Sequence, residues 1–289
     1  MEVFRNKIIN FIQSTFTRND TGDEVLQRFD DKYYNDVVDS TFKALTKDKK
    51  PQEKPLLIKL GAQSGSGKTT QLLPAITTAL NKNNIDYVHL AVRLFVKNHP
   101  HYRELLEKYG ESLIREKTNA FALFCCFGVM EKLIKNKFNI FWEITLLAPD
   151  FEEYIIRLAK KYNYKILFNI ISIPLEISNT WIKDRSLNSN YEKNRVVLDN
   201  TANFFYNILG EAIKRILMLK DIFDDGDYMV MWNVFEKKPI LISNNFNENI
   251  IELFNKNRIF VDGMLKKVND EKVALNYKTE FYDKFLSEF

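Results

Sequence analysis

The sequence predicts an α/β fold of three layers, in which helices cover both faces of a mostly parallel sheet. Short apolar runs of strand length alternate with longer stretches that have apolar residues at helical spacing, which is the βαβ pattern. These apolar runs are residues 56–60, 87–92, 138–144 and 164–173. The first run also breaks directly into a Gly/Ser-rich loop and then a helical pattern. Two late runs, 227–234 and 237–243, are typical of strands joined by a turn.

The chain divides into three regions of different character. Apolar residues recur at helical spacing over 3–15 and again over about 23–45, which predicts two helices. The charged stretch 46–55 contains two prolines and is expected to be a linker or an exposed turn. The predicted units are an N-terminal helical segment, 1–50, the α/β domain, 51–245, and a C-terminal helical tail, 246–289.

Composition and charge exclude several classes of protein. Apolar residues make up 45% of the 289 residues and charged residues 28%, as in an ordinary globular domain. The net charge of +4 arises from mixed signs and gives no argument for a nucleic-acid partner. No segment approaches the ~18 uncharged apolar residues of a membrane span. Charges also interrupt the N-terminal apolar residues, unlike in a signal peptide. We therefore expect a cytoplasmic protein with no membrane and no nucleic-acid partner.

The stretch LLIKLGAQSGSGKTTQLL contains a phosphate-binding loop, or P-loop. A strand, a Gly/Ser loop and a helix that opens with Lys-Thr place backbone N–H groups and a helix N-terminus around one point. Gly65 and Gly67 allow conformations and close approaches that a Cβ would forbid. Lys68 is expected to reach the β and γ phosphates of ATP or GTP, and the Thr69 hydroxyl to bind Mg²⁺. The predicted nucleotide-binding residues are Gln63, Ser64, Gly65, Ser66, Gly67, Lys68, Thr69 and Thr70.

Other features favour a small-molecule kinase over a nucleotide hydrolase. The Asn-Lys-x-Asp motif of GTPases is absent from the sequence, and no apolar run ends in the Asp that a motor ATPase requires. The predicted strands end instead in VRL, 92–94, and in WEIT, 142–145. We therefore predict a P-loop NTPase/kinase fold with a mostly parallel sheet, flanked by N- and C-terminal helices.

Three blocks follow the P-loop and carry a resemblance to a known family. They are FVKNHPHYRELLEKYG at 95–110, FNIFWEITLLAPD at 138–150, and ISIPLEISNTWIKDRS at 171–186 with NRV at 194–196. In this order and at these spacings, the chain resembles the zeta toxin family over about 55–243. That family consists of P-loop kinases that phosphorylate UDP-N-acetylglucosamine and so block cell-wall synthesis, usually held in check by an antitoxin. The resemblance implies Mg-ATP as cosubstrate, a nucleotide sugar as acceptor and an antitoxin as a partner.

The resemblance assigns roles to individual residues. Lys68 and Thr69 match the family's P-loop Lys and Mg²⁺ ligand. Glu143 matches the Glu at the end of the third strand and Thr145 the Thr two residues on, both of which hold the sugar substrate in the family. Independently of the family, Glu143 interrupts an apolar run at the C-terminal edge of a parallel sheet, where ligands bind in such folds.

Two arginines complete the catalytic set that the resemblance implies. Arg185 and Arg195 match the pair that closes on the transferring phosphate in the family. Phosphoryl transfer depends on positioning and charge neutralisation, so a kinase needs cations besides Lys68 at the γ-phosphate. Both arginines lie in and around the polar, Asn-rich segment RSLNSNYEKNR, which is expected to close as a lid.

The sequence departs from the family in two places. Ala62 replaces the first glycine of the P-loop, and we expect Gly61 to absorb the turn. At the end of the second strand, Arg93 replaces the family's Asp, taken to be the base, and an arginine accepts no proton near neutral pH. The nearest carboxylate, Asp86, precedes the strand, at the opposite edge of the sheet. Three explanations stay open: Glu143 acts as the base, Arg93 binds an anionic part of another nucleotide, sugar or cofactor, or the protein binds nucleotide without transferring it.

The histidines and cysteines indicate no metal centre. His89 lies in a predicted strand and is expected to be a satisfied core residue, whereas His99 belongs to a His-Pro turn. His99 and His101 lack further ligands at a suitable spacing. Cys125 and Cys126 are neighbours on a helix and point about 100° apart, so we expect two buried apolar side chains and no disulfide.

Overall fold

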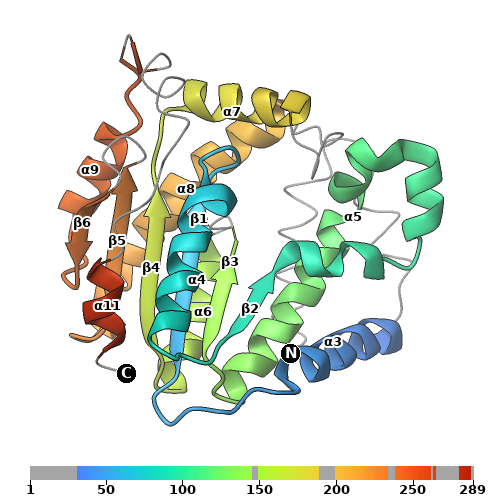
Figure 1. Cartoon of the computed structure of the whole chain (residues 1–289), viewed down its shortest axis with the longest axis horizontal. Helices are drawn as coiled ribbons and strands as arrows, with labels where there is room; N and C mark the ends of the chain where they lie inside the picture. The colour runs from blue at the N-terminus through green and yellow to red at the C-terminus, as the bar shows by residue number, and fades with distance from the viewer. Residues whose placement is uncertain are drawn as a thin grey trace.

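The computed structural model describes residues 31–144, 149–188, 199–233, 238–261, 263–264 and 280–287. Its centre is a six-stranded sheet with the order β2-β3-β1-β4-β5-β6 (Figure 1). Neighbouring strands run parallel, except that β5 and β6 are antiparallel. The strands are β1 (Leu56–Ala62), β2 (Val88–Ala91), β3 (Ile140–Glu143), β4 (Lys165–Ile171), β5 (Tyr228–Asn233) and β6 (Lys238–Ser243). All six predicted strands, including the late pair, are confirmed.

Helices cover both faces of the sheet, which confirms the predicted three-layer α/β fold. One face packs against α4, α7 and α11, and the other against α3, α5, α6, α8 and α9. In Figure 1, α4 and α11 lie in front of the sheet and α6 and α8 behind it. The helices are α3 (Asp31–Thr46), η1 (Lys68–Leu72), α4 (Leu73–Lys82), η2 (Val92–Asn98), α5 (Tyr102–Lys135), α6 (Pro149–Lys161), α7 (Leu175–Asn188), α8 (Asp199–Met218), η3 (Lys220–Ile222), α9 (Asn249–Lys256) and α11 (Glu280–Leu286).

The longest helix, α5, spans 34 residues and is interrupted once, at Gly110. This glycine has φ 72° and ψ 174°, which no helical residue adopts, so it divides α5 into two parts. The second part carries the apolar stretch around Phe121, Phe124 and Phe127, and these side chains are buried in the core. Within the described residues, neither α5 nor any other helix has the length and apolarity needed to cross a membrane.

A buried ion pair lies behind the central strand. The seven residues of β1 are all buried, as expected for a strand covered on both faces. Lys59 nevertheless faces the core and forms an ion pair with Glu152 in the first turn of α6. Its ammonium group also lies 4.4 Å from the centre of the Trp142 ring. This pair fixes the start of α6, the helix that follows strand β3, against the middle of the sheet.

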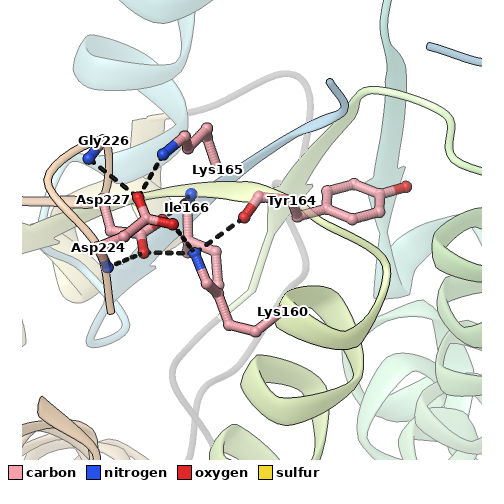
Figure 2. Close-up of polar contacts among 7 residues, drawn as sticks. All are labelled: Lys160, Tyr164, Lys165, Ile166, Asp224, Gly226 and Asp227. Carbon is pink, nitrogen blue, oxygen red and sulfur yellow. Dashed lines mark hydrogen bonds and ion pairs between the residues drawn. The ribbon is translucent and has the colours of Figure 1, made fainter. Parts of the chain in front are cut away.

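A second charged network lies at the end of the sheet where β4 begins (Figure 2). Nζ of Lys160, in the last turn of α6, donates to carboxylate oxygens of Asp224 at 2.9 Å and of Asp227 at 2.6 Å. The other oxygen of Asp227 accepts the backbone N–H of Ile166 at 2.7 Å, and Lys165 forms an ion pair with Asp224. Because the P-loop follows the other end of β1, these contacts lie at the end of the sheet away from the P-loop.

The described parts of the N-terminal segment and the C-terminal tail pack into the cores of the domain. The helix predicted over 23–45 is confirmed from Asp31 onward as α3, and it lies against α5 where Gly128 leaves room for Tyr34. In α11, the buried Tyr282 donates a hydrogen bond to Asn169 of β4. The helix predicted over 3–15 lies outside the described residues. The three-unit division of the chain stays a prediction.

Candidate active site

The P-loop joins β1 to α4 in the predicted manner. Gly65 and Gly67 have φ values of 74° and 80°, left-handed conformations that only glycine adopts without strain. Both glycines thus have the conformational role that the sequence predicts. The helix opens at Lys68 with one wide π-helical turn before α4 continues it. The expectation for Gly61 is wrong: this residue lies within β1, paired with Ile170, and the turn begins only after the strand ends.

Helix α7 supports the P-loop from the side of β4. The side-chain amide of Gln63 donates to the carbonyl oxygen of Ile173 and to the hydroxyl of Ser178, each at 2.8 Å. A Cβ on Gly65 would come closer than 3.0 Å to the carbonyl oxygen of Ser178 and to Ile182. The loop is therefore held by direct packing against α7. Ser178 was missed in the sequence, where its only signal is a small residue one turn after the Ser-Ile-Pro stretch.

The other polar groups of the loop differ in what they contact. The Ser66 hydroxyl is buried and has no hydrogen-bond partner among the described residues. It is therefore available to donate to a phosphate oxygen, together with the backbone N–H groups at the start of the helix. The hydroxyl of Thr70 points back to the carbonyl of Gly67 at 3.5 Å. The phosphate-binding role of Ser64 stays a prediction.

Glu143 lies at the end of β3, next to the P-loop, and three side chains face its carboxylate. The hydroxyl of Thr69 donates to Oε1 at 2.7 Å. NH1 of Arg93 donates to Oε2 in an ion pair, and Nε2 of His89 lies 3.5 Å from the same oxygen. Only 4% of the Glu143 side chain is exposed. The carboxylate of Glu143, at the end of β3, thus contacts side chains in and just after β2 and also Thr69, which follows the P-loop lysine.

These neighbours keep Glu143 ionised. Burial alone would raise the pKa of this carboxyl group. The approach of His89, the charge of Lys68 and the contact with Arg93 outweigh burial and hold its pKa well below the usual range. A carboxylate with so low a pKa and with both oxygens engaged is a weak proton acceptor. Its two oxygens instead accept hydrogen bonds from Thr69 and Arg93 and so hold these two side chains in place.

The oxygen atoms of Thr69 and Glu143 fit Mg²⁺, which prefers hard oxygen ligands and keeps several waters. Among the described residues, no group of three or more His, Cys, Asp or Glu is arranged to hold a metal ion. A Mg²⁺ ion here would therefore depend on the Thr69 hydroxyl, the nucleotide phosphates and water, with Glu143 as the carboxylate behind them. The metal role of Thr69 stays a prediction.

Three predicted site residues are not placed with their side chains. Thr145 and Arg195 lie outside the described residues. Arg185 belongs to the last turn of α7 by its backbone, but its side chain is outside the described part. The roles of these residues, and the closing of the segment between the arginines as a lid, stay predictions. Asp86 lies before β2 and contacts Lys49 at 2.6 Å, so it is remote from the site as expected.

The prediction for His89 is wrong, whereas those for the cysteines are confirmed. The His89 ring stacks on Phe141 at 5.1 Å, but its Nε2 is buried without a hydrogen-bond partner among the described residues and faces Glu143. Sequence reasoning missed this because the partner comes from another strand. Cys125 and Cys126 are buried and form no disulfide. Burial raises the pKa of both thiols, that of Cys126 to about 12, so neither is reactive.

The parallel sheet, the Gly/Ser loop after its central strand and the Lys-Thr at the helix start define a P-loop protein with a kinase-like fold. The chain belongs to the zeta toxin family, whose model matches residues 40–234. The toxin PezT of Streptococcus pneumoniae is 31% identical to the chain over 153 residues, which are 53% of this chain and 58% of PezT. The match therefore spans somewhat more than half of that relative's length.

Solved structures share the fold. The structure described for the PezAT chromosomal toxin-antitoxin system of Streptococcus pneumoniae has a TM-score of 0.64 and 23% identity, and the match covers 91% of this chain and 99% of that one. The complex of AvrRxo1-ORF1 and AvrRxo1-ORF2 with ATP has a TM-score of 0.50 and 14% identity, covering 89% of this chain and 84% of that chain. At these identities the likeness establishes the common architecture.

Proposed function

We propose that the chain is a kinase that uses Mg-ATP to phosphorylate a hydroxyl group of a small metabolite, with UDP-N-acetylglucosamine as the leading acceptor. The observation that carries this proposal is the hydrogen bond between Thr69 and Glu143. It brings a P-loop hydroxyl and an ionised carboxylate together beside Lys68, as a phosphoryl-transfer site requires. Membership of the zeta toxin family supports the acceptor, and the ATP complex of a protein with the same fold supports ATP over GTP.

In this proposal each residue has a separate task. Lys68 and the loop N–H groups neutralise and orient the β and γ phosphates. Mg²⁺, when bound at Thr69, would neutralise charge on the phosphate oxygens. Glu143 holds the Thr69 hydroxyl in place and is the family-matched residue for the acceptor, together with Thr145. Arg185 and Arg195 are proposed to close on the γ-phosphate.

The proposal requires no carboxylate base at the end of β2. Arg93 occupies that place, and Glu143 is a weak proton acceptor because of its low pKa. Phosphoryl transfer depends mainly on positioning and charge stabilisation, and a general base contributes about 10² to 10⁴ in rate. A kinase of reduced turnover is therefore compatible with the site. The rival function is a protein that binds nucleotide without transferring phosphate. Its support is the same replacement of a carboxylate by Arg93.

We also propose an antitoxin as the protein partner, acting in the cytoplasm where ATP and nucleotide sugars are available. The support is that PezAT is a toxin-antitoxin system and that AvrRxo1-ORF1 forms a complex with ORF2. A partner that covers the P-loop would keep the toxin silent. Co-expression with the neighbouring open reading frame and co-purification is the direct measurement.

The experiment that tests the kinase measures transfer from γ-labelled ATP to a panel of metabolites, including UDP-N-acetylglucosamine. Lys68→Ala should abolish transfer without loss of folding, because this lysine is a point charge at a loop–helix junction. Expression of the wild type in a bacterium should slow growth, and Lys68→Ala should relieve the effect. Nucleotide binding without transfer to any acceptor would favour the silent binder, and equal growth arrest by both forms would contradict kinase toxicity.

A further inference from the structure

Arg93 lies beside Glu143, the residue that the proposed function assigns to the acceptor. Ala91, the last residue of β2, pairs with Glu143 of β3, and Arg93 follows in η2. The strand order places these two strand ends on the side of β1 away from β4. Helix α7 packs against the P-loop from the β4 side, so Arg93 and α7 lie on opposite sides of the loop.

The guanidinium group of Arg93 is used at one nitrogen only. NH1 donates to Oε2 of Glu143, and among the described residues Arg93 makes no other hydrogen bond or ion pair. One third of its side chain, 33%, is exposed. A guanidinium group carries five N–H donors in a planar fork, so the donors on NH2 and Nε remain available. Such a fork matches the oxygens of a phosphate group in a bidentate manner.

Glu143 holds this fork in a fixed place. Its carboxylate is nearly fully buried, and Thr69 fixes its other oxygen at 2.7 Å. The ion pair therefore orients the Arg93 side chain before any ligand binds, which lowers the entropy lost on binding. The local charge is also unbalanced, because the single carboxylate of Glu143 faces both Arg93 and the charge of Lys68. Lys68 is used by the nucleotide, and Arg93 is left for an anion on the acceptor side.

Resting on the kinase function proposed above, we propose that the open edge of Arg93 binds a phosphate group of the acceptor and selects acceptors that carry one. This makes Arg93 a specificity-determining residue. A hydroxyl compound without phosphate would leave the guanidinium donors to water and would gain nothing from them. Lys in this position would keep the charge but lose the bidentate fork.

The test compares two acceptors that differ only in a phosphate group, N-acetylglucosamine 1-phosphate and N-acetylglucosamine, in the full chain. Arg93→Gln should lower kcat/KM for the first about 10- to 100-fold, mostly through KM, since a hydrogen bond to a charged group contributes about 1.5–3 kcal/mol. It should slow transfer to the second much less, so the preference for phosphate collapses. Arg93→Lys should keep part of the preference. The matched control is Lys97→Gln, an exposed cation in the same helix η2, which should keep all of it.

An unchanged preference in Arg93→Gln, with both acceptors slowed by one factor, would overturn the inference, because Arg93 would then only position Glu143. If circular dichroism shows that Arg93→Gln is not folded, Arg93→Lys takes its place, and the ratio of kcat/KM for the two acceptors is compared in the same way. A binding measurement separates this inference from the kinase proposal, because it does not require transfer. Calorimetry measures the affinities for UDP and for uridine while a non-hydrolysable Mg-ATP analogue saturates the P-loop. If the wild type binds UDP more tightly than uridine and Arg93→Gln loses this difference, the inference is supported even without transfer. Equal binding, or binding of neither compound, overturns it.

Discussion

The hydroxyl of Thr69 donates a 2.7 Å hydrogen bond to the carboxylate of Glu143, although 74 positions separate the two residues. The contact follows from the strand order, because β3 pairs directly with β1 and places Glu143 opposite Leu60. The P-loop begins shortly after this point of β1. An acidic residue at the end of β3 must therefore face the first residues of the helix that binds phosphate.

The charge of Glu143 is expected to support Mg²⁺ at this contact. Glu143→Gln keeps the shape and the oxygen that accepts from Thr69 but removes the charge. We expect it to weaken binding of Mg-ATP about tenfold or more, because two unit charges at ~4 Å interact by about 4 kcal/mol at an effective dielectric of 20, before screening. Binding of ATP without metal should change little. Calorimetry with and without Mg²⁺ measures the difference.

The control for this prediction is Glu104→Gln, an exposed carboxylate in the first turn of α5. It should bind both forms of ATP as the wild type does. If Glu143→Gln loses the same affinity with and without Mg²⁺, the carboxylate acts on the loop itself and not on the metal.

Gly65 is expected to be indispensable for a steric reason. Gly65→Ala would press its Cβ against the carbonyl of Ser178 and would also hold a non-glycine residue at φ 74°. Gly110→Ala is the matched control, since that glycine has φ 72° but no atom within 4 Å of the place that a Cβ would occupy. Gly110→Ala should lower the free energy of unfolding by about 1 kcal/mol. Gly65→Ala should in addition abolish ATP binding, as measured by calorimetry, and equal behaviour of the two variants would contradict the role of α7.

The fold is largely predictable because its central strands, β1, β3 and β4, are buried on both faces. Such strands are continuous apolar runs, and β1, β3 and β4 stand out against the polar, helical stretches between them. The P-loop is predictable for a similar reason, since its glycines and Lys-Thr are adjacent in the chain. The docking of α11 was not predictable, because it depends on Tyr282 reaching Asn169 from 113 positions away.

The candidate site is predictable only where its residues are neighbours in sequence. Thr69 and Glu143 were each identified, but their contact depends on which strand pairs with β1. The apolar strand around His89 predicts a core residue, whereas the Nε2 atom of His89 faces Glu143. The support of the loop by Ser178 has no sequence signal beyond a small residue in a helix. Contacts between distant segments thus set the electrostatics of the site.

His99 is expected to make stability fall in mild acid. Burial, and to a lesser extent His101, lower the pKa of His99 from 6.5 to about 4. Between these values the unfolded chain binds a proton that the native protein does not, so stability falls as the pH drops from about 6.5 to 4. The slope for one such proton is about 1.4 kcal/mol per pH unit. His99→Gln should show a shallower loss of urea stability over this range.

The control for the pH prediction is His101→Gln, which removes a partly exposed histidine from the same turn. Its stability should follow the wild-type pH dependence, apart from a small change caused by the lost neighbouring charge. Other titrating groups are common to all three proteins and cancel in the comparison. A slope in His99→Gln equal to that of the wild type would show that His99 is protonated in the native state.

The buried pair of Lys59 and Glu152 offers a prediction about what maintains the core behind the site. Each side chain is at most 1% exposed, and burial lowers the pKa of Lys59 although Glu152 opposes the shift. Lys59→Met alone removes the positive charge beside a buried carboxylate, and Glu152→Leu alone removes the negative charge beside a buried ammonium group. Each single change should lower the free energy of unfolding by about 3–5 kcal/mol.

The double variant Lys59→Met, Glu152→Leu should recover most of that loss, because replacing both charges by apolar side chains of similar volume also removes their desolvation penalty. Urea unfolding of the four proteins gives the coupling energy directly. An exposed pair on α8, Lys214 and Glu211, is the matched control, and its cycle should give about 0.2–0.5 kcal/mol. If the double variant is as unstable as the sum of the single ones, the two charges do not act through each other, and the start of α6 is held by its apolar contacts alone.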